Sequence, residues 1–118
     1  MAASFLELAR EEAAIGYESK DMRRVRDAAE KAWLSALQAT DAAMERHGQF
    51  PEPGPRSHAT RHEFLERMGR RDLSVKLHQF ADRLHGKYFY FGAVPEKDGM
   101  SVDLDEVADF ILRVGEEV

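Results

Sequence analysis

The sequence has no cysteine and no asparagine, and only three of its 118 residues are glutamine. The absence of cysteine excludes disulfide bonds, thiolate catalysis and cysteine-bound metal, and it fits a reducing cytoplasm. No apolar run approaches the roughly 18 residues of a membrane span, and the first residues lack the pattern of a signal peptide. Few thermolabile residues beside 33% charged residues is a pattern seen in thermophile proteins. We expect a cytoplasmic protein that does not enter membranes.

Charge is distributed unevenly along the chain. The net charge is −5, and residues 96–118 contribute −6 of it, which leaves +1 for residues 1–95. An acidic protein with a pI of about 5.5 is poorly suited to duplex DNA, because non-specific affinity comes from neutralising phosphates. A small basic pocket is compatible with this balance. The length fits a single domain over residues 1–118.

Apolar residues recur every three or four positions along most of the chain, which is the pattern of amphipathic helices. The clearest segment is 21–47, with an apolar stripe of Ala29, Trp33, Ala36, Leu37 and Met44. Thr40 lies on the same face, where its hydroxyl is expected to bond to a carbonyl one turn earlier. No segment reads as a strand. We predict an all-α, antiparallel up-and-down bundle of four to five helices.

Helix starts are predicted from three capping-box patterns. These are Ser4-x-x-Glu7, Thr60-x-x-Glu63 and Asp103-x-x-Glu106. The first pattern predicts a helix over residues 4–19. The second and third predict that helices begin at residues 60 and 103, and a turn is expected over residues 94–99.

Helix ends are predicted from glycine and proline. Gly48 is expected to end the long helix, and the prolines of residues 48–57 predict a loop. The apolar spacing then predicts one helix over residues 73–91. Gly69, before it, indicates either a short break or a continuous helix. The apolar face of the 73–91 helix contains Leu77, Phe80, Leu84 and Tyr88.

No motif of a common hydrolase or dinucleotide-binding fold is present. His58 and His62 are four residues apart and precede Glu63, as two helical metal ligands would. A cap at Thr60 would place His58 before the helix, and no third ligand is evident. The preferred interpretation is a solvated helix start, so we expect neither a metal nor another cofactor.

The segment around residue 85 is the most chemically suggestive. His85 lies at the side of the apolar stripe, where an imidazole can act as acid, base or hydrogen-bond donor to phosphate. Arg83 offers a guanidinium for phosphate. The alternative is a boundary histidine beside a helix–helix contact. Gly86 then marks a close backbone approach or a kink, because glycine in mid-helix costs about 1 kcal/mol relative to alanine.

Residues 88–91 are four consecutive aromatics, Tyr-Phe-Tyr-Phe. Four consecutive side chains on a helix cannot all face one core, so at least one must reach solvent, a ligand or a partner subunit. Stacking on bases is one interpretation, with Tyr90 nearest the polar site. The other interpretation combines core packing with a dimer interface made by Trp33, Tyr88 and Phe91.

Residues 83–92 resemble the Leu-His-x-x-Phe-Tyr signature of the archaeal PaREP1 family. The matching residues are Leu84, His85, Phe89 and Tyr90, with one extra residue between the histidine and the Phe-Tyr pair. Residues 29–43 are similar to the second helix of that family and of the wider HEPN class. The resemblance implies a HEPN-like bundle, often a homodimer, in a class that includes ribonucleases, toxins, nucleotide-binding proteins and inert partners.

Nuclease members of the HEPN class use an Arg-x(4–6)-His pair at a dimer cleft. This chain has two formal matches, Arg56 with His62 and Arg71 with His78. About 1.5 matches are expected by chance in a chain of this composition, so their number decides nothing. Arg71 is the better placed arginine, because Asp72 follows it and His78 lies on the 73–91 helix.

Three functions are compatible with these observations. The first is a homodimeric binding module that presents Arg83, His85, Lys87 and Tyr90 to a nucleotide, an RNA end or a protein partner. The second is a metal-independent endoribonuclease of toxin type, in which Arg71 steadies the scissile phosphate and His78 transfers protons. The third is a structural or antitoxin-side partner without catalysis. The first is favoured, since His78 follows a core position and is expected to be occluded.

Overall fold

The computed structural model describes residues 2–50 and 57–118, which are almost entirely helical. No strand occurs among these residues. The helices are α1 (Ala2–Ser19), α2 (Met22–Arg46), α3 (Ser57–Arg67), α4 (Arg71–Phe80), the π-helix η1 (Ala81–Tyr90) and α5 (Lys97–Glu117). The all-α bundle expected from the sequence is confirmed.

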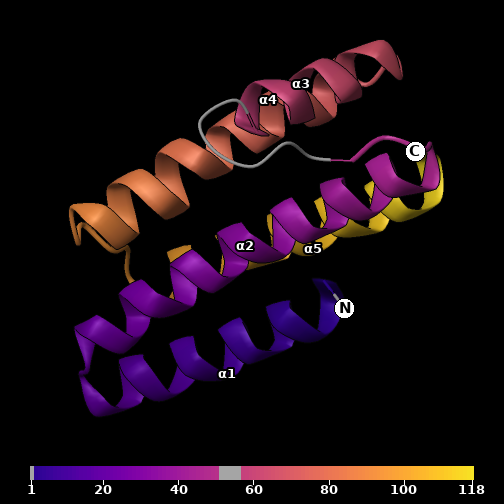
Figure 1. Ribbon diagram of the computed structural model, residues 1–118. Coiled ribbons are helices and arrows are strands. Elements are labelled where there is room, and N and C mark those ends of the chain that lie inside the picture. The colour runs from indigo at the N-terminus through magenta and orange to yellow at the C-terminus, as the bar shows by residue number, and fades with distance from the viewer. Residues whose placement is uncertain (1, 51–56) are drawn as a thin grey trace.

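The bundle is built around α2, which packs extensively against α1, α5 and η1 and touches α3 over a smaller area. α1 and α2 form an antiparallel hairpin, and α5 packs against both of them (Figure 1). η1 continues from α4 and packs along α2, while α3 folds back on α4. The predicted stripe of α2 faces this interior, where small residues such as Ala29, Ala32 and Ala36 are fully buried. The Thr40 hydroxyl donates to the Ala36 carbonyl at 3.0 Å, as predicted.

Three helices end with the same C-terminal capping motif. The residues after α1, α2 and α3 adopt positive φ, at Lys20 (58°), Gly48 (73°) and Gly69 (75°). In each case the next amide donates to a carbonyl five residues earlier, at 2.8–2.9 Å, which is the Schellman pattern. The prediction that Gly48 ends the long helix is therefore confirmed. Gly69 makes a break between α3 and α4 rather than a continuous helix.

The three predicted capping boxes are wrong. α1 begins before Ser4, and α3 begins before Thr60. α5 begins at Lys97, where the Met100 amide donates to the Glu96 carbonyl at 3.0 Å. Residues 97–99, expected in a turn, therefore belong to α5. Asp103, expected as a cap, lies in the middle of α5 and is buried, with 7% exposure.

The predicted helix over residues 73–91 consists of two segments with different winding. α4 is followed by η1, in which backbone hydrogen bonds span five residues. The Phe91 amide continues this pattern to the Gly86 carbonyl at 3.1 Å. A Cβ on Gly86 would meet only the Ala81 carbonyl oxygen, at an ordinary 3.5 Å. Gly86 therefore lies within the π-wound segment and does not mark a close approach of two helices.

Asp103 binds two side chains of η1. Arg83 Nη1 donates to Oδ1 at 2.8 Å, and the Tyr88 hydroxyl donates to Oδ2 at 2.5 Å. Burial, together with this bond to a carboxylate, raises the pKa of Tyr88 above its usual range. Arg83 and Tyr88 are five residues apart, so the π winding brings them to the same side of the helix. Every buried side-chain nitrogen and oxygen among the described residues has a partner, which explains why this carboxylate is tolerated in the core.

We expect Asp103→Ala to lower the free energy of unfolding by about 2–4 kcal/mol, because it leaves the Tyr88 hydroxyl and the Arg83 guanidinium without their acceptor. Asp105→Ala, on the same helix, removes an exposed ion pair with Arg10 and should cost less than about 1 kcal/mol. Urea unfolding followed by circular dichroism measures both variants. Equal losses would contradict the structural role of the buried carboxylate.

Candidate functional site

His85 on η1 is held by a carboxylate from α2. Its Nδ1 lies 2.8 and 3.0 Å from the two oxygens of Glu30. A carboxylate can only accept here, so Nδ1 carries the hydrogen and neutral His85 keeps Nε2 as its acceptor nitrogen. Nε2 has no hydrogen-bond partner among the described residues, and the side chain is 39% exposed. In the neutral ring Nε2 can accept a hydrogen bond from a ligand, and in the protonated ring it can donate one to a phosphate.

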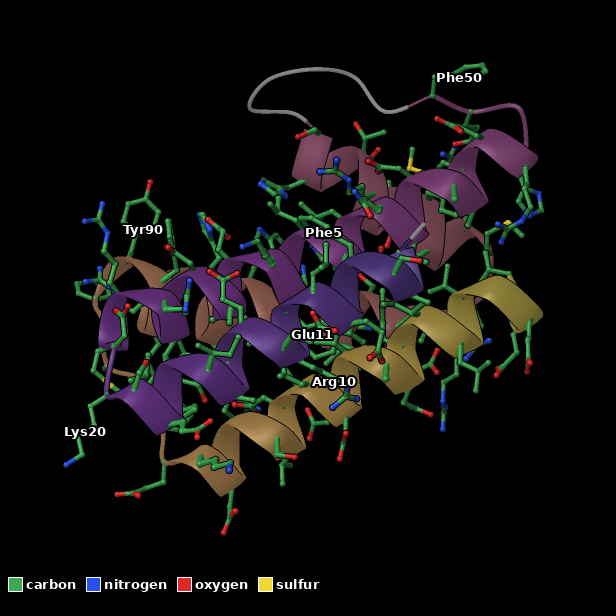
Figure 2. The ribbon with its side chains drawn as sticks, turned by 90° about the horizontal axis from the view of Figure 1, so that it is seen from below. Phe5, Arg10, Glu11, Lys20, Phe50 and Tyr90 are labelled. Atoms are coloured by element: carbon green, nitrogen blue, oxygen red, sulfur yellow. The ribbon has the colours of Figure 1, made fainter. Side chains whose placement is uncertain are left out.

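Aromatic rings surround His85. Trp33 of α2 lies 6.1 Å away between ring centroids, Phe89 is stacked at 6.1 Å, and Tyr90 meets the ring edge-on at 5.0 Å. Tyr90 is 67% exposed and projects from one end of the molecule (Figure 2). His85 and Tyr90 are five residues apart, so their contact depends on the π winding of η1.

Arg26 of α2 fixes the end of η1. Its Nε and Nη2 donate to the Phe89 carbonyl at 2.9 and 2.6 Å, and Nη2 also donates to the Tyr90 carbonyl at 3.1 Å. These carbonyls have no partner within the helix, and a cation at a helix C-terminus is favourable. Gly92 follows with φ of +72°, and a Cβ there would lie 3.2 Å from Arg26 Cζ. The position of Tyr90 is therefore set from α2.

An open depression of about 560 Å³ lies where α2 meets the end of η1. Its lining includes Arg23, Arg26, Phe89 and Tyr90. Arg23 is exposed and has no ion-pair or hydrogen-bond partner among the described residues. A volume in this range is typical of small-molecule sites, and the combination of an aromatic ring with a free guanidinium suits a planar, phosphorylated ligand.

The four residues predicted to bind a ligand do not form one cluster. His85 faces α2 and touches Tyr90, and Lys87 is exposed. Arg83 is turned to α5, where it donates to Asp103 and lies 3.8 Å from Glu106. Arg83 therefore does not join the ligand-binding cluster predicted from the sequence, because its guanidinium is bound to the buried carboxylate of Asp103.

Two α2 residues of this site, Arg26 and Glu30, were not found by sequence reasoning. They precede Trp33 at steps of four and three, and so lie along the same side of α2 as the predicted stripe. That spacing was the available signal. Charged residues on the same side of a helix as its apolar stripe need polar partners. Here η1 provides them, the Phe89 carbonyl for Arg26 and His85 for Glu30.

The predicted nuclease residues Arg71 and His78 both lie on α4, and both are exposed. The expected occlusion of His78 is wrong. The two are seven positions apart along the helix, so they share a helix face. The His78 ring stacks on His62 of α3, with centroids 3.5 Å apart and planes 6° apart. The other formal match involves Arg56, which lies outside the described residues.

His58 and His62 are both helical, because α3 begins at Ser57. His62 Nδ1 lies 2.9 Å from the Ser74 hydroxyl, and burial, aided by the charge of His78, lowers the pKa of His62 to about 4. His58 stacks on Trp33 at 5.8 Å. Within residues 2–50 and 57–118, no three metal-ligating side chains gather into a possible metal site.

Of the three residues predicted at a dimer interface, the fold buries two. Trp33 is 3% and Tyr88 5% exposed, whereas Phe91 is 86% exposed. Phe91 alone of the three is thus available to a second subunit in this conformation, and the homodimer stays a prediction. Across the described part of the chain, no helix combines the length and apolar character needed to cross a bilayer.

Stability is expected to fall between pH 7 and pH 5 through His62. Its pKa is near 6.5 when unfolded and about 4 when folded, so the unfolded chain binds the proton more readily as the pH falls. The loss should be about 1 kcal/mol, after discounting the partly exposed ring for solvent screening. Thermal unfolding at the two pH values should show a smaller loss for His62→Gln than for the wild type. His47→Gln, at the C-cap of α2, is the control, and an unchanged loss in His62→Gln would contradict the assignment.

The chain was compared with known proteins, and it matches no protein family, no curated protein and no solved structure. Its resemblance to PaREP1 and HEPN proteins therefore depends on the residues quoted for it.

Proposed function

We propose that the protein is a binding module for single-stranded RNA or a nucleotide, with its site where α2 meets η1. The observation that carries the proposal is the exposed ring of Tyr90 beside His85, whose Nε2 is left available by Glu30. Any base can stack on an exposed aromatic ring, and a protonated imidazole can donate from Nε2 to a phosphate.

Local charge supports an anionic ligand at this end of the molecule. Residues 20–31 contain five basic and three acidic residues, although the whole chain is acidic. Arg23 and Lys87 are exposed and have no partner in the described part of the chain. A short single strand or a nucleotide needs few such contacts, whereas a duplex needs a broad basic surface.

The resemblance to HEPN proteins supports the same proposal, because that class includes nucleotide-binding members and RNA-directed members. It also supports a homodimer, for which Phe91 provides an exposed apolar side chain near the site. A partner subunit at Phe91 would extend the stacking surface beside Tyr90.

Tyr90→Ala should weaken the binding of a fluorescein-labelled hexauridylate RNA by about tenfold, since one base–aromatic stack is worth about 1–3 kcal/mol. Fluorescence anisotropy measures the affinity at fixed salt. Phe50→Ala is the matched control, because Phe50 is 72% exposed and lies far from Tyr90, near the opposite end (Figure 2). The proposal fails if the wild type does not bind, or if the two variants bind equally.

A second candidate is a metal-independent endoribonuclease, and the exposure of both Arg71 and His78 on one face of α4 favours it. If it is correct, His78→Ala should lower cleavage of single-stranded RNA in the presence of chelator by at least about 100-fold, as expected for a general acid–base group. Gel analysis of the products measures this. His47→Ala is the control, and intact RNA after incubation with the wild type would exclude the candidate.

A further inference from the structure

Two imidazoles from different helices pack against Trp33. The His85 ring of η1 lies 6.1 Å from it, measured between ring centroids. The His58 ring of α3 is stacked on it at 5.8 Å, with planes 30° apart. Trp33 is 3% exposed. His58 thus occupies a place where another planar ring, such as a base, would stack on Trp33.

The two halves of α3 are held in different ways. The second half contributes Phe64 and Leu65, which are fully buried. The first half is held by polar contacts. His62 stacks on His78 at 3.5 Å and bonds to Ser74 at 2.9 Å. Arg61 forms a two-point ion pair with Asp41 of α2, at 2.7 and 3.0 Å.

We propose that the first half of α3 is an acid-released cover over Trp33, and that its movement opens a second place for a base to stack, next to His85. The stack of His62 on His78 keeps the cover closed, and protonation of both rings separates them. The identity of the ligand as a single-stranded RNA rests on the proposed function. The movement of α3 does not.

The surroundings of the stacked pair favour release when it is charged. Two parallel imidazolium rings 3.5 Å apart repel each other, and little water lies between them to screen the charges. From α3, His58 adds to the repulsion and Glu66 opposes it. From α4, only His78 and the Ser74 hydroxyl face His62 among the described residues. From α2, Asp41 is already paired with Arg61. Positive charge on the three imidazoles of His58, His62 and His78 would therefore be opposed by one carboxylate, that of Glu66.

The movement is tested through Trp33, the only tryptophan of the chain. Acrylamide quenching of its fluorescence should rise at least about threefold between pH 7.5 and pH 5.0 in the wild type, while circular dichroism stays helical. His62→Phe keeps a ring on His78 but cannot be protonated, so it should remain closed at pH 5.0. His58→Ala should be open at both pH values, and His47→Gln should behave as the wild type. An inaccessible Trp33 at pH 5.0 in the wild type overturns the proposal, and so does a full pH response in His62→Phe.

The stacking place is tested with the labelled hexauridylate RNA. Binding should quench Trp33 emission at pH 5.0 and much less at pH 7.5, and His58→Ala should show the quenching at both. If anisotropy shows binding but Trp33 emission does not change at pH 5.0, the second stacking place is refuted and the proposed function stands. If no RNA binds at either pH, the proposed function and the second stacking place both fail, and the acrylamide result still decides whether α3 moves.

Discussion

The winding of η1 is the constraint on which the rest of this structure depends. Hydrogen bonds that span five residues bring side chains five apart to the same side of the helix. Arg83 and Tyr88 therefore converge on Asp103 of α5. On another side of the same helix, His85 meets Tyr90. In an α-helix neither pair would be adjacent, so the core carboxylate would lose a donor and His85 would lose its exposed aromatic neighbour.

Two carboxylates from neighbouring helices fix the two sides of η1, and they do different work. Asp103 is buried and takes donors that stay in the protein, so it stabilises the fold. Glu30 binds a histidine that is 39% exposed and leaves its other ring nitrogen to solvent. The contrast separates a structural contact from one that is suited to a ligand. It also explains why Arg83 and His85, only two residues apart in sequence, do not share a site.

The sequence was sufficient for the helices and for most of the core, because apolar spacing depends on local geometry. The stripe of α2 and the buried positions Leu77, Phe80, Leu84 and Tyr88 are where periodicity placed them. Some of the predictions that failed depended on contacts distant in sequence. Asp103 has the spacing of a helix cap, and only its pairing with a helix 15–20 residues away shows that it faces inward. Glu30 lies 55 residues from His85, so no local pattern connects them. The π winding had one local sign, two consecutive steps of four from Phe80 to Tyr88.

The resemblance to the Leu-His-x-x-Phe-Tyr signature gains a geometric meaning from η1. In that signature the histidine and the tyrosine are four residues apart, which an α-helix places side by side. In this chain the two are five residues apart, and the backbone hydrogen bonds of η1 span five residues where those of an α-helix span four. At a separation of five residues an α-helix would rotate one ring away from the other, and the wider winding of η1 keeps His85 and Tyr90 in contact.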